Sequence, residues 1–287
     1  MAGLGFHTGT RVVVWSEKAG LNAYDFNPTK QAGTENHGGR RLALPGGKPG
    51  GAEPQTPWTL TGLQKQIDQF VLHYDGEGFS RNTFNVLQQR GLSAHFLLDV
   101  DGTIYQTLDL RERAYHATIA NSRSIGIEMA NRGAFPPEKS KELDAWYATD
   151  AQKGIGLRPP ANVGATGVLT PNFIARPDQP QIVTGVLNGR ILKQYNFTSE
   201  QYAALIKLTA ALHRIFPQIK VDYPRDVAGR LVRNKLADQR LEKYHGLLGH
   251  WHIQNNKIDP GPAFQWDRLI DGARRELAGD KHGVDGP

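Results

Sequence analysis

The sequence predicts an α/β fold, and three segments support this class. The apolar run FVLHY, Phe70–Tyr74, has the length and composition of a buried strand. Residues 93–109 read as two β runs around Asp101-Gly102, a dipeptide that accepts the positive φ angles of a tight hairpin turn. Residues 198–216 place apolar side chains at helical spacing behind a capping-box pattern. With 287 residues, 39% of them hydrophobic, the chain can bury a sizeable core.

The remaining elements of the first half follow in order. Ser80 is expected to cap a short helix over residues 81–90, and Gly91 supplies the stop signal at its end. The run SIGIEMA, Ser124–Ala130, is a further strand candidate. Strands and helices therefore alternate, as in a compact α/β unit.

Two helices are expected near the C-terminus. A polar, basic helical segment is predicted around residues 226–240, and a last helix over 263–277. Between them lies the apolar run LLG, which ends at His250. In residues 198–216, the capping box is formed by Thr198 and Gln201.

Two segments lack this regularity. Residues 1–60 are rich in Gly, Pro, Asn and Thr, which predicts an N-terminal extension that lies on the domain or extends partly away from it. Residues 61–280 are expected to form one domain, with a loop-rich insertion at about 135–195. Such a stretch inside a compact domain is typical of a functional surface insertion or a lid.

Composition narrows the chemistry. The chain has no cysteine, which excludes disulfides, thiol nucleophiles and Cys-ligated zinc, so any metal must be held by nitrogen and oxygen atoms. The formal charge of +6 suits polyanionic surroundings, such as nucleic acid, anionic lipid or an acidic cell-wall polymer, or simply a solvated basic surface. Because there is no long basic tract and no nucleic-acid motif, we expect no nucleic-acid partner.

Two histidines and a carboxylate are candidates for metal binding. His73 ends the first buried strand and precedes a polar loop, a place where clefts form, although a lone histidine there is more often structural. His250 also follows an apolar run, and Asp259 stands before Pro260 in KIDPGP. Two histidines and a carboxylate are a recurrent ligand set for catalytic zinc. Spacing alone is a weak signal, because the set matches no compact motif such as H-E-x-x-H.

Four segments together carry a resemblance to a known family. They are FVLHYDG, SAHFLLDVDGTIYQ, AYHATIANSRSIGIEMAN and GHWHIQNNKIDPGPAFQW. In this order they resemble the zinc-dependent N-acetylmuramoyl-L-alanine amidases, the type-2 family related to peptidoglycan recognition proteins, over residues 67–135 and 196–275. The resemblance implies a mixed central β-sheet flanked by helices, with a zinc cleft at one edge. It also implies hydrolysis of the amide between N-acetylmuramic acid and L-alanine in peptidoglycan or muropeptides.

Carried over position by position, the resemblance makes three residues the ligands of Zn²⁺: His73, His250 and Asp259. Glu128 matches the acid/base residue of the family, and Lys257 matches a cation that steadies the oxyanion. The segment from His250 to Asp259 is about one residue shorter than in the commonest family form, which leaves the loop geometry open but not the ligand types.

The resemblance also places two residues near the substrate, His116 and Asn121. A packing role for His116 and a turn-forming role for Asn121 are the alternatives. His252 competes with His250 for the metal and is expected to be its neighbour, while His95 is expected to be a hydrogen-bonded sheet residue.

Catalysis has alternatives as well. Glu128 can instead be an outward-facing residue of an edge strand, and Lys257 an ordinary loop lysine. The chain can be a catalytically silent peptidoglycan-binding module, although such modules usually lack part of the zinc set. A different zinc hydrolase or a polyanion-binding protein is a third interpretation.

Location and assembly are less defined by the sequence. No basic segment followed by a long apolar core is visible near the N-terminus, so we expect no signal peptide and no membrane span, which favours an intracellular start. Recycling of anhydromuropeptides, phage-type lysis and an exported form without its leader all remain open. The sequence predicts no oligomeric state.

Overall fold

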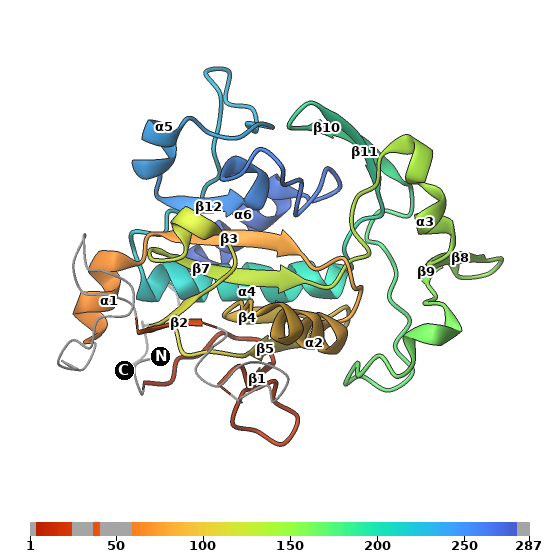
Figure 1. Cartoon of the computed structure of the whole chain (residues 1–287), viewed down its shortest axis with the longest axis horizontal. Coiled ribbons are helices and arrows are strands. Elements are labelled where there is room, and N and C mark those ends of the chain that lie inside the picture. Colours follow the sequence, from red (N-terminus) through yellow and green to blue (C-terminus); the bar gives the residue numbers. More distant parts are fainter. Residues whose placement is uncertain (1–3, 25–36, 41–58, 280–287) are drawn as a thin grey trace.

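The computed structural model describes residues 4–24, 37–40 and 59–279, which are built around a mixed six-stranded sheet (Figure 1). Its order is β1 (Val12–Val14), β5 (Ile104–Gln106), β4 (Phe96–Leu98), β7 (Ser124–Met129), β3 (Gln69–Tyr74) and β12 (Gly246–Gly249). Strands β4, β7, β3 and β12 are mutually parallel, whereas β5 runs antiparallel to β4. The predicted mixed α/β class is therefore confirmed.

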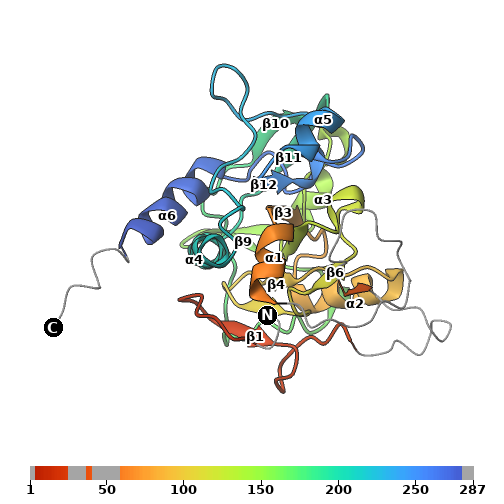
Figure 2. The same ribbon diagram turned by 90° about the vertical axis from the view of Figure 1, so that its left-hand side faces the viewer.

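Helices cover both faces of this sheet (Figure 2). Helices α4 (Ser199–Ile215) and α6 (Trp266–Gly279) pack together on one face, and α2 (Ser80–Arg90) lies against the other. Strand side chains alternate between these layers, so Phe70 and Leu72 join the core beneath α4 while Val71 packs on the opposite side. None of the helices that the structure describes combines the length and apolarity needed to cross a bilayer.

Several predicted elements are confirmed. Strand β3, the β4–β5 hairpin with Gly102 at φ 81°, and β7 lie where the sequence places them. Thr198 and Gln201 form the expected capping box of α4: the Thr198 hydroxyl accepts from the Gln201 N–H, and the Gln201 carboxamide accepts from the Thr198 N–H.

Two predictions about helices are wrong. Ser80 is the first residue of α2 rather than its cap, and Phe79 occupies the cap position without a side-chain bond. A helix was predicted around residues 226–240, but helix begins there only at Asp238, where α5 (Asp238–Glu242) starts. The Asp226 carboxylate accepts bonds from the backbone N–H groups of Ala228 and Arg230. These bonds favour a turn over a helix, as short acidic side chains often do.

The described parts of the first sixty residues lie on the domain. Strand β1 extends the main sheet beside β5, and β2 (His37–Arg40) pairs with β6 (Glu112–Ala114). Most of the Gly/Pro-rich stretch, residues 25–36 and 41–58, lies outside the described residues. A short helix, α1 (Leu60–Gln66), leads into β3.

The segment predicted as an insertion contains two hairpins joined by irregular stretches. These are β8 (Tyr147–Asp150) with β9 (Gly154–Leu157), and β10 (Val183–Leu187) with β11 (Arg190–Gln194). Helix α3 (Lys141–Asp144) and the 3₁₀ turns η2 (Pro137–Lys139) and η3 (Ala161–Val163) complete it. In Figure 1 the segment lies beyond the ends of β3 and β7, and β10–β11 reaches toward the region after β12.

Candidate metal centre

The register of two parallel strands places the first candidate residues together. His73 is the fifth residue of β3 and pairs with Glu128, the fifth residue of β7. Neighbours such as Leu72 and Ile127 face the α4 core, so alternation turns His73 and Glu128 to the opposite face. Both lie near the carboxyl ends of their strands, the edge at which open α/β sheets place ligand sites.

The third parallel strand brings the other ligands from far along the chain. Strand β12 pairs with β3 and ends at Gly249, after which the 3₁₀ turn η4 (His250–His252) begins. The loop then returns so that the Trp251 N–H donates to the Asp259 carbonyl at 3.4 Å. His250 and Asp259 are thereby brought to His73.

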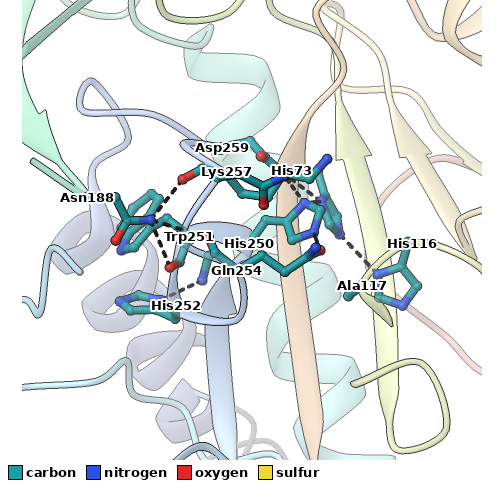
Figure 3. Close-up of polar contacts among 12 residues, drawn as sticks. His73, His116, Ala117, Asn188, His250, Trp251, His252, Gln254, Lys257 and Asp259 are labelled. Carbon is teal, nitrogen blue, oxygen red and sulfur yellow. Dashed lines mark hydrogen bonds and ion pairs between the residues drawn. The ribbon is translucent and has the colours of Figure 1, made fainter. Parts of the chain in front are cut away.

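Three donor atoms converge at this edge, as Figure 3 shows. His73 Nδ1 lies 2.8 Å from Asp259 Oδ2 and 3.0 Å from His250 Nδ1, and His250 Nδ1 lies 3.0 Å from the same Asp259 oxygen. The side chains are 2%, 6% and 12% exposed for His73, His250 and Asp259. Within the part of the chain that the structure describes, these three side chains are the ones whose ligand atoms lie close enough together to hold a metal ion.

The protonation states suit metal ligation. Burial, together with the neighbouring His250, lowers the pKa of His73 to about 4, although the hydrogen bond and charge of Asp259 act to raise it. Burial acts to raise the pKa of Asp259, but the attraction of His250 and hydrogen bonds with both histidines hold that pKa well below its usual range. A neutral imidazole and an ionised carboxylate are the forms in which these groups bind metals.

The outer nitrogen of each histidine also has a partner. His73 Nε2 lies 3.0 Å from His116 Nδ1, and His116 Nε2 lies 3.1 Å from the Ser124 hydroxyl. His250 Nε2 lies 2.7 Å from the Gln254 side-chain oxygen. Partners of this kind fix the ring orientation and the tautomer, which leaves Nδ1 of each ring as the ligand atom. The donor set and its surroundings therefore fit a bound metal.

Glu128 and Lys257 flank the three converging side chains. Burial raises the pKa of the half-buried Glu128 well above its ordinary value, the carboxylates of Asp259 and Asp75 raise it further, and the Lys257 ammonium opposes them. The Lys257 charge also acts to lower the pKa of His73, so its ammonium influences both Glu128 and a candidate ligand. A raised pKa makes a carboxylate a stronger base and so favours uptake of a proton.

The structure separates the other histidines from the converging set. His252 is fully buried and turned away, with its ring bonded to the Gly249 N–H and the Val232 carbonyl, as expected of a neighbour rather than a ligand (Figure 3). His95 accepts a bond from the Gly126 N–H and contacts the Glu112 carbonyl, as expected for a hydrogen-bonded sheet residue.

His116 and Asn121 have protein partners in the structure. His116 reaches the ligand His73, and Asn121 accepts bonds from the backbone N–H groups of His116 and Ala117. Asn121 therefore forms the turn that holds His116. Their contact with substrate stays a prediction.

Sequence reasoning missed two residues that support this site. Gln254 follows His250 by four positions, and this spacing places both on one face of a helical turn, which is the signal that was available. Gly126 lies beneath His116, where an added Cβ would come within 2.6 Å of the ring. No local pattern indicates that approach.

A buried centre of two histidines and one carboxylate, flanked by a carboxyl with a raised pKa and an ammonium, is typical of metal-dependent hydrolases. A family model described as N-acetylmuramoyl-L-alanine amidase matches residues 63–262, a range that contains every predicted site residue. The chain belongs to this amidase family, and its activity is hydrolysis of the N-acetylmuramoyl-L-alanine amide in peptidoglycan or muropeptides. The resemblance seen in the sequence motifs is confirmed.

Solved structures of similar proteins carry related names. A selenomethionine derivative of AmpD is 18% identical, with 73% of this chain and 86% of that chain covered and a TM-score of 0.35. AmiD from E. coli, solved with anhydro-N-acetylmuramic acid-L-Ala-D-gamma-Glu-L-Lys, is 19% identical, with coverages of 78% and 62% and a TM-score of 0.41. The endolysin amidase LysCS from Clostridium intestinale is 14% identical, with coverages of 74% and 86% and a TM-score of 0.38. No curated protein matches the chain significantly.

Proposed function

We propose that this amidase is zinc-dependent and that His73, His250 and Asp259 hold the ion. The observation that carries the proposal is the convergence of two imidazole nitrogens and one carboxylate oxygen within 3.0 Å of one another, all in buried side chains. Nitrogen and oxygen donors in this combination suit Zn²⁺. The chain has no cysteine that would offer another ligand set.

The acid/base role falls to Glu128. When bound, zinc supplies a Lewis acid and lowers the pKa of water from about 15.7 to about 7. Glu128 takes a proton from the attacking water and returns it to the departing alanine nitrogen. Burial raises its pKa well above the ordinary value, which makes the carboxylate a stronger base toward the attacking water.

Lys257 is proposed to stabilise the charge that develops on the carbonyl oxygen. Its loop also carries Asp259, two residues later, so the ammonium and the ligand are positioned together. Removing one preorganised donor to a developing oxyanion typically costs about 3 kcal/mol.

His116 and Asn121 keep their proposed contact with substrate. Their bonds support an additional role, because Asn121 holds the backbone of His116 and His116 orients the His73 ring. We assign the amidase domain to residues 61–280, with residues 1–60 as an extension. The insertion at 135–195 is proposed to narrow the cleft or to bind glycan, with a dimer contact as the alternative.

Digestion of purified muropeptides tests this function. The protein is assayed before chelation, after chelation and after zinc is added back, and products are identified by mass spectrometry. We expect free stem peptide beginning at L-alanine, lost on chelation and restored by zinc. Activity that survives complete removal of metal would overturn the zinc proposal. Binding of intact muropeptide without turnover in every condition would instead support the silent binding module.

A parallel digestion decides between substrate sizes. Intact sacculi and soluble anhydromuropeptides are offered to the same preparation at matched molar concentrations of the amide bond. Preference for the soluble fragments would support a recycling role, and release of stem peptides from sacculi would support a lytic one.

A further inference from the structure

The β10–β11 hairpin contacts the loop that carries two of the three candidate ligands. Asn188, at the hairpin turn, directs its side-chain Nδ2 toward three carbonyl oxygens of that loop (Figure 3). The distances are 3.3 Å to Trp251, 3.3 Å to Gln254 and 3.0 Å to Lys257. All three carbonyls lie within the segment from His250 to Asp259.

Asn188 is itself held from the other side. Its side-chain oxygen accepts from the Lys235 N–H at 2.7 Å, and its own N–H donates to the Arg233 carbonyl at 2.9 Å. Its backbone has φ 46°, and Gly189 follows at φ 74°, as a tight two-residue hairpin turn requires. The amide group is thus fixed in position and in orientation.

The base of the hairpin holds the far end of the same loop. Gln194 is fully buried and its Nε2 donates to the Pro260 carbonyl at 3.1 Å, while its oxygen accepts from the Ala263 N–H at 3.0 Å. Leu187 and Leu192 anchor both strands in the main core, at 0% and 1% exposure. The hairpin therefore contacts the ligand loop before and after Asp259.

Apart from the Trp251 N–H bond to the Asp259 carbonyl, which joins the two ends of the loop, the backbone bonds within the loop are local. The Ile253 and Gln254 N–H groups donate to the His250 carbonyl, and the Lys257 N–H donates to the Gln254 carbonyl. These bonds shape single turns, whereas the three carbonyls that meet Asn188 come from successive turns. One amide group that faces all three carbonyls joins these turns into a unit.

We propose that the β10–β11 hairpin braces the metal-binding loop, with Asn188 as the positioning residue that sets how His250, Lys257 and Asp259 are presented. The inference rests on the proposed metal site, and it gives the part of the insertion that contains this hairpin a definite role. Asn188 touches no ligand side chain, so it acts through the backbone of the loop. Loss of the Asn188 amide should weaken metal binding and displace Lys257, while all three candidate ligands remain in the chain.

Asn188→Gly tests the brace, because glycine accepts the positive φ while removing the amide. Gly189→Asn is the matched control: it perturbs the same turn, its added side chain meets nothing within 4 Å of Cβ, and the Asn188 amide remains. The zinc dissociation constant is measured by competition with a chromophoric chelator, and kcat and KM are measured on muropeptide. We expect about tenfold or greater weakening of zinc binding in Asn188→Gly. We also expect kcat to fall while KM changes little.

Hydrogen exchange of residues 250–259 in the metal-free protein separates this inference from the proposed function. Faster exchange in Asn188→Gly than in Gly189→Asn would support the brace, whether or not the wild-type protein binds zinc. Absence of zinc binding by the wild-type protein would overturn only the metal proposal. Unchanged exchange would overturn the brace. If the wild-type protein binds zinc, a zinc affinity and kcat of Asn188→Gly within twofold of the control would also overturn it. If Asn188→Gly does not fold, Asn188→Asp replaces it, because the carboxylate keeps the acceptor for Lys235 and loses the donor.

Discussion

Glu128 and His73 are paired across the adjacent parallel strands β7 and β3, so both side chains leave the same face of the sheet. Neighbouring strands lie about 4.8 Å apart, which makes this separation a property of the sheet rather than of a loop. The acid/base candidate is therefore held beside a metal ligand by backbone hydrogen bonding. The loop that carries Lys257 and Asp259 needs the β10–β11 hairpin for comparable order.

Removing a ligand should remove metal and activity together. In His73→Ala or Asp259→Ala, two donors remain, too few to retain zinc against a chelator. We expect substoichiometric zinc by elemental analysis and no detectable release of stem peptide. The exposed His7 offers a control, since His7→Ala should keep both. Stoichiometric zinc in either ligand variant would contradict the ligand assignment.

Glu128→Gln should separate metal binding from turnover. The amide has nearly the shape of the carboxyl but cannot accept the proton of the attacking water, so we expect kcat to fall about 10²- to 10⁴-fold with zinc retained. Zinc content, circular dichroism and muropeptide kinetics check this. Glu138→Gln, on an exposed turn, is the matched control. A rate near that of the control would move the base to another residue.

Lys257→Met should lower kcat rather than raise KM. The substitution keeps the length of the side chain and removes the charge that stabilises the transition state, so we expect about a 10²- to 10³-fold loss of kcat. Steady-state kinetics on a defined muropeptide measure the two parameters, with the exposed Lys139→Met as control. A change confined to KM would indicate substrate binding instead.

Gly126→Ala should weaken metal binding indirectly. The new methyl group would lie 2.6 Å from the His116 ring, which must move and give up its contact with His73. Loss of such a partner typically costs about 10- to 100-fold in metal affinity. Chelator competition measures it, and Gly5→Ala, where an added Cβ meets nothing within 4 Å, is the control. Equal zinc affinity in both variants would show that His116 does not orient His73.

Asp99 should make stability depend on pH. Burial raises the pKa of this fully buried carboxyl to about 7, with the carboxylates of Asp101 and Asp75 adding to the rise. Because the folded pKa lies above the unfolded value of 3.8, the contribution of Asp99 is fully present below about pH 4 and is lost as pH rises through 7. Asn at this position stays neutral.

We therefore expect Asp99→Asn to raise the free energy of unfolding by about 2–4 kcal/mol at pH 8, and by less at pH 5. Urea denaturation at the two pH values measures the difference. A variant that is equally stabilised at both, or destabilised at pH 8, would contradict the raised pKa.

Short-range patterns were sufficient for much of the fold. The buried strand before His73, the Asp101-Gly102 hairpin and the capping box of α4 were all predicted, because each depends on neighbours within a few residues. The same local reading failed over most of residues 226–240, where the Asp226 side chain bonds to the backbone and replaces helix with a turn. At Ser80, a favourable cap residue lies one position inside the helix.

By itself the sequence determined the α/β class, the motifs that identify the amidase family, and the residue types available for a metal site without cysteine. The convergence of His73 with residues 177 and 186 positions away was decided by the parallel pairing of β3 and β12. The contact of Asn188 with a loop more than sixty residues later exists only in the folded chain. Periodicity and turn chemistry act between near neighbours, whereas these contacts depend on how whole elements pack.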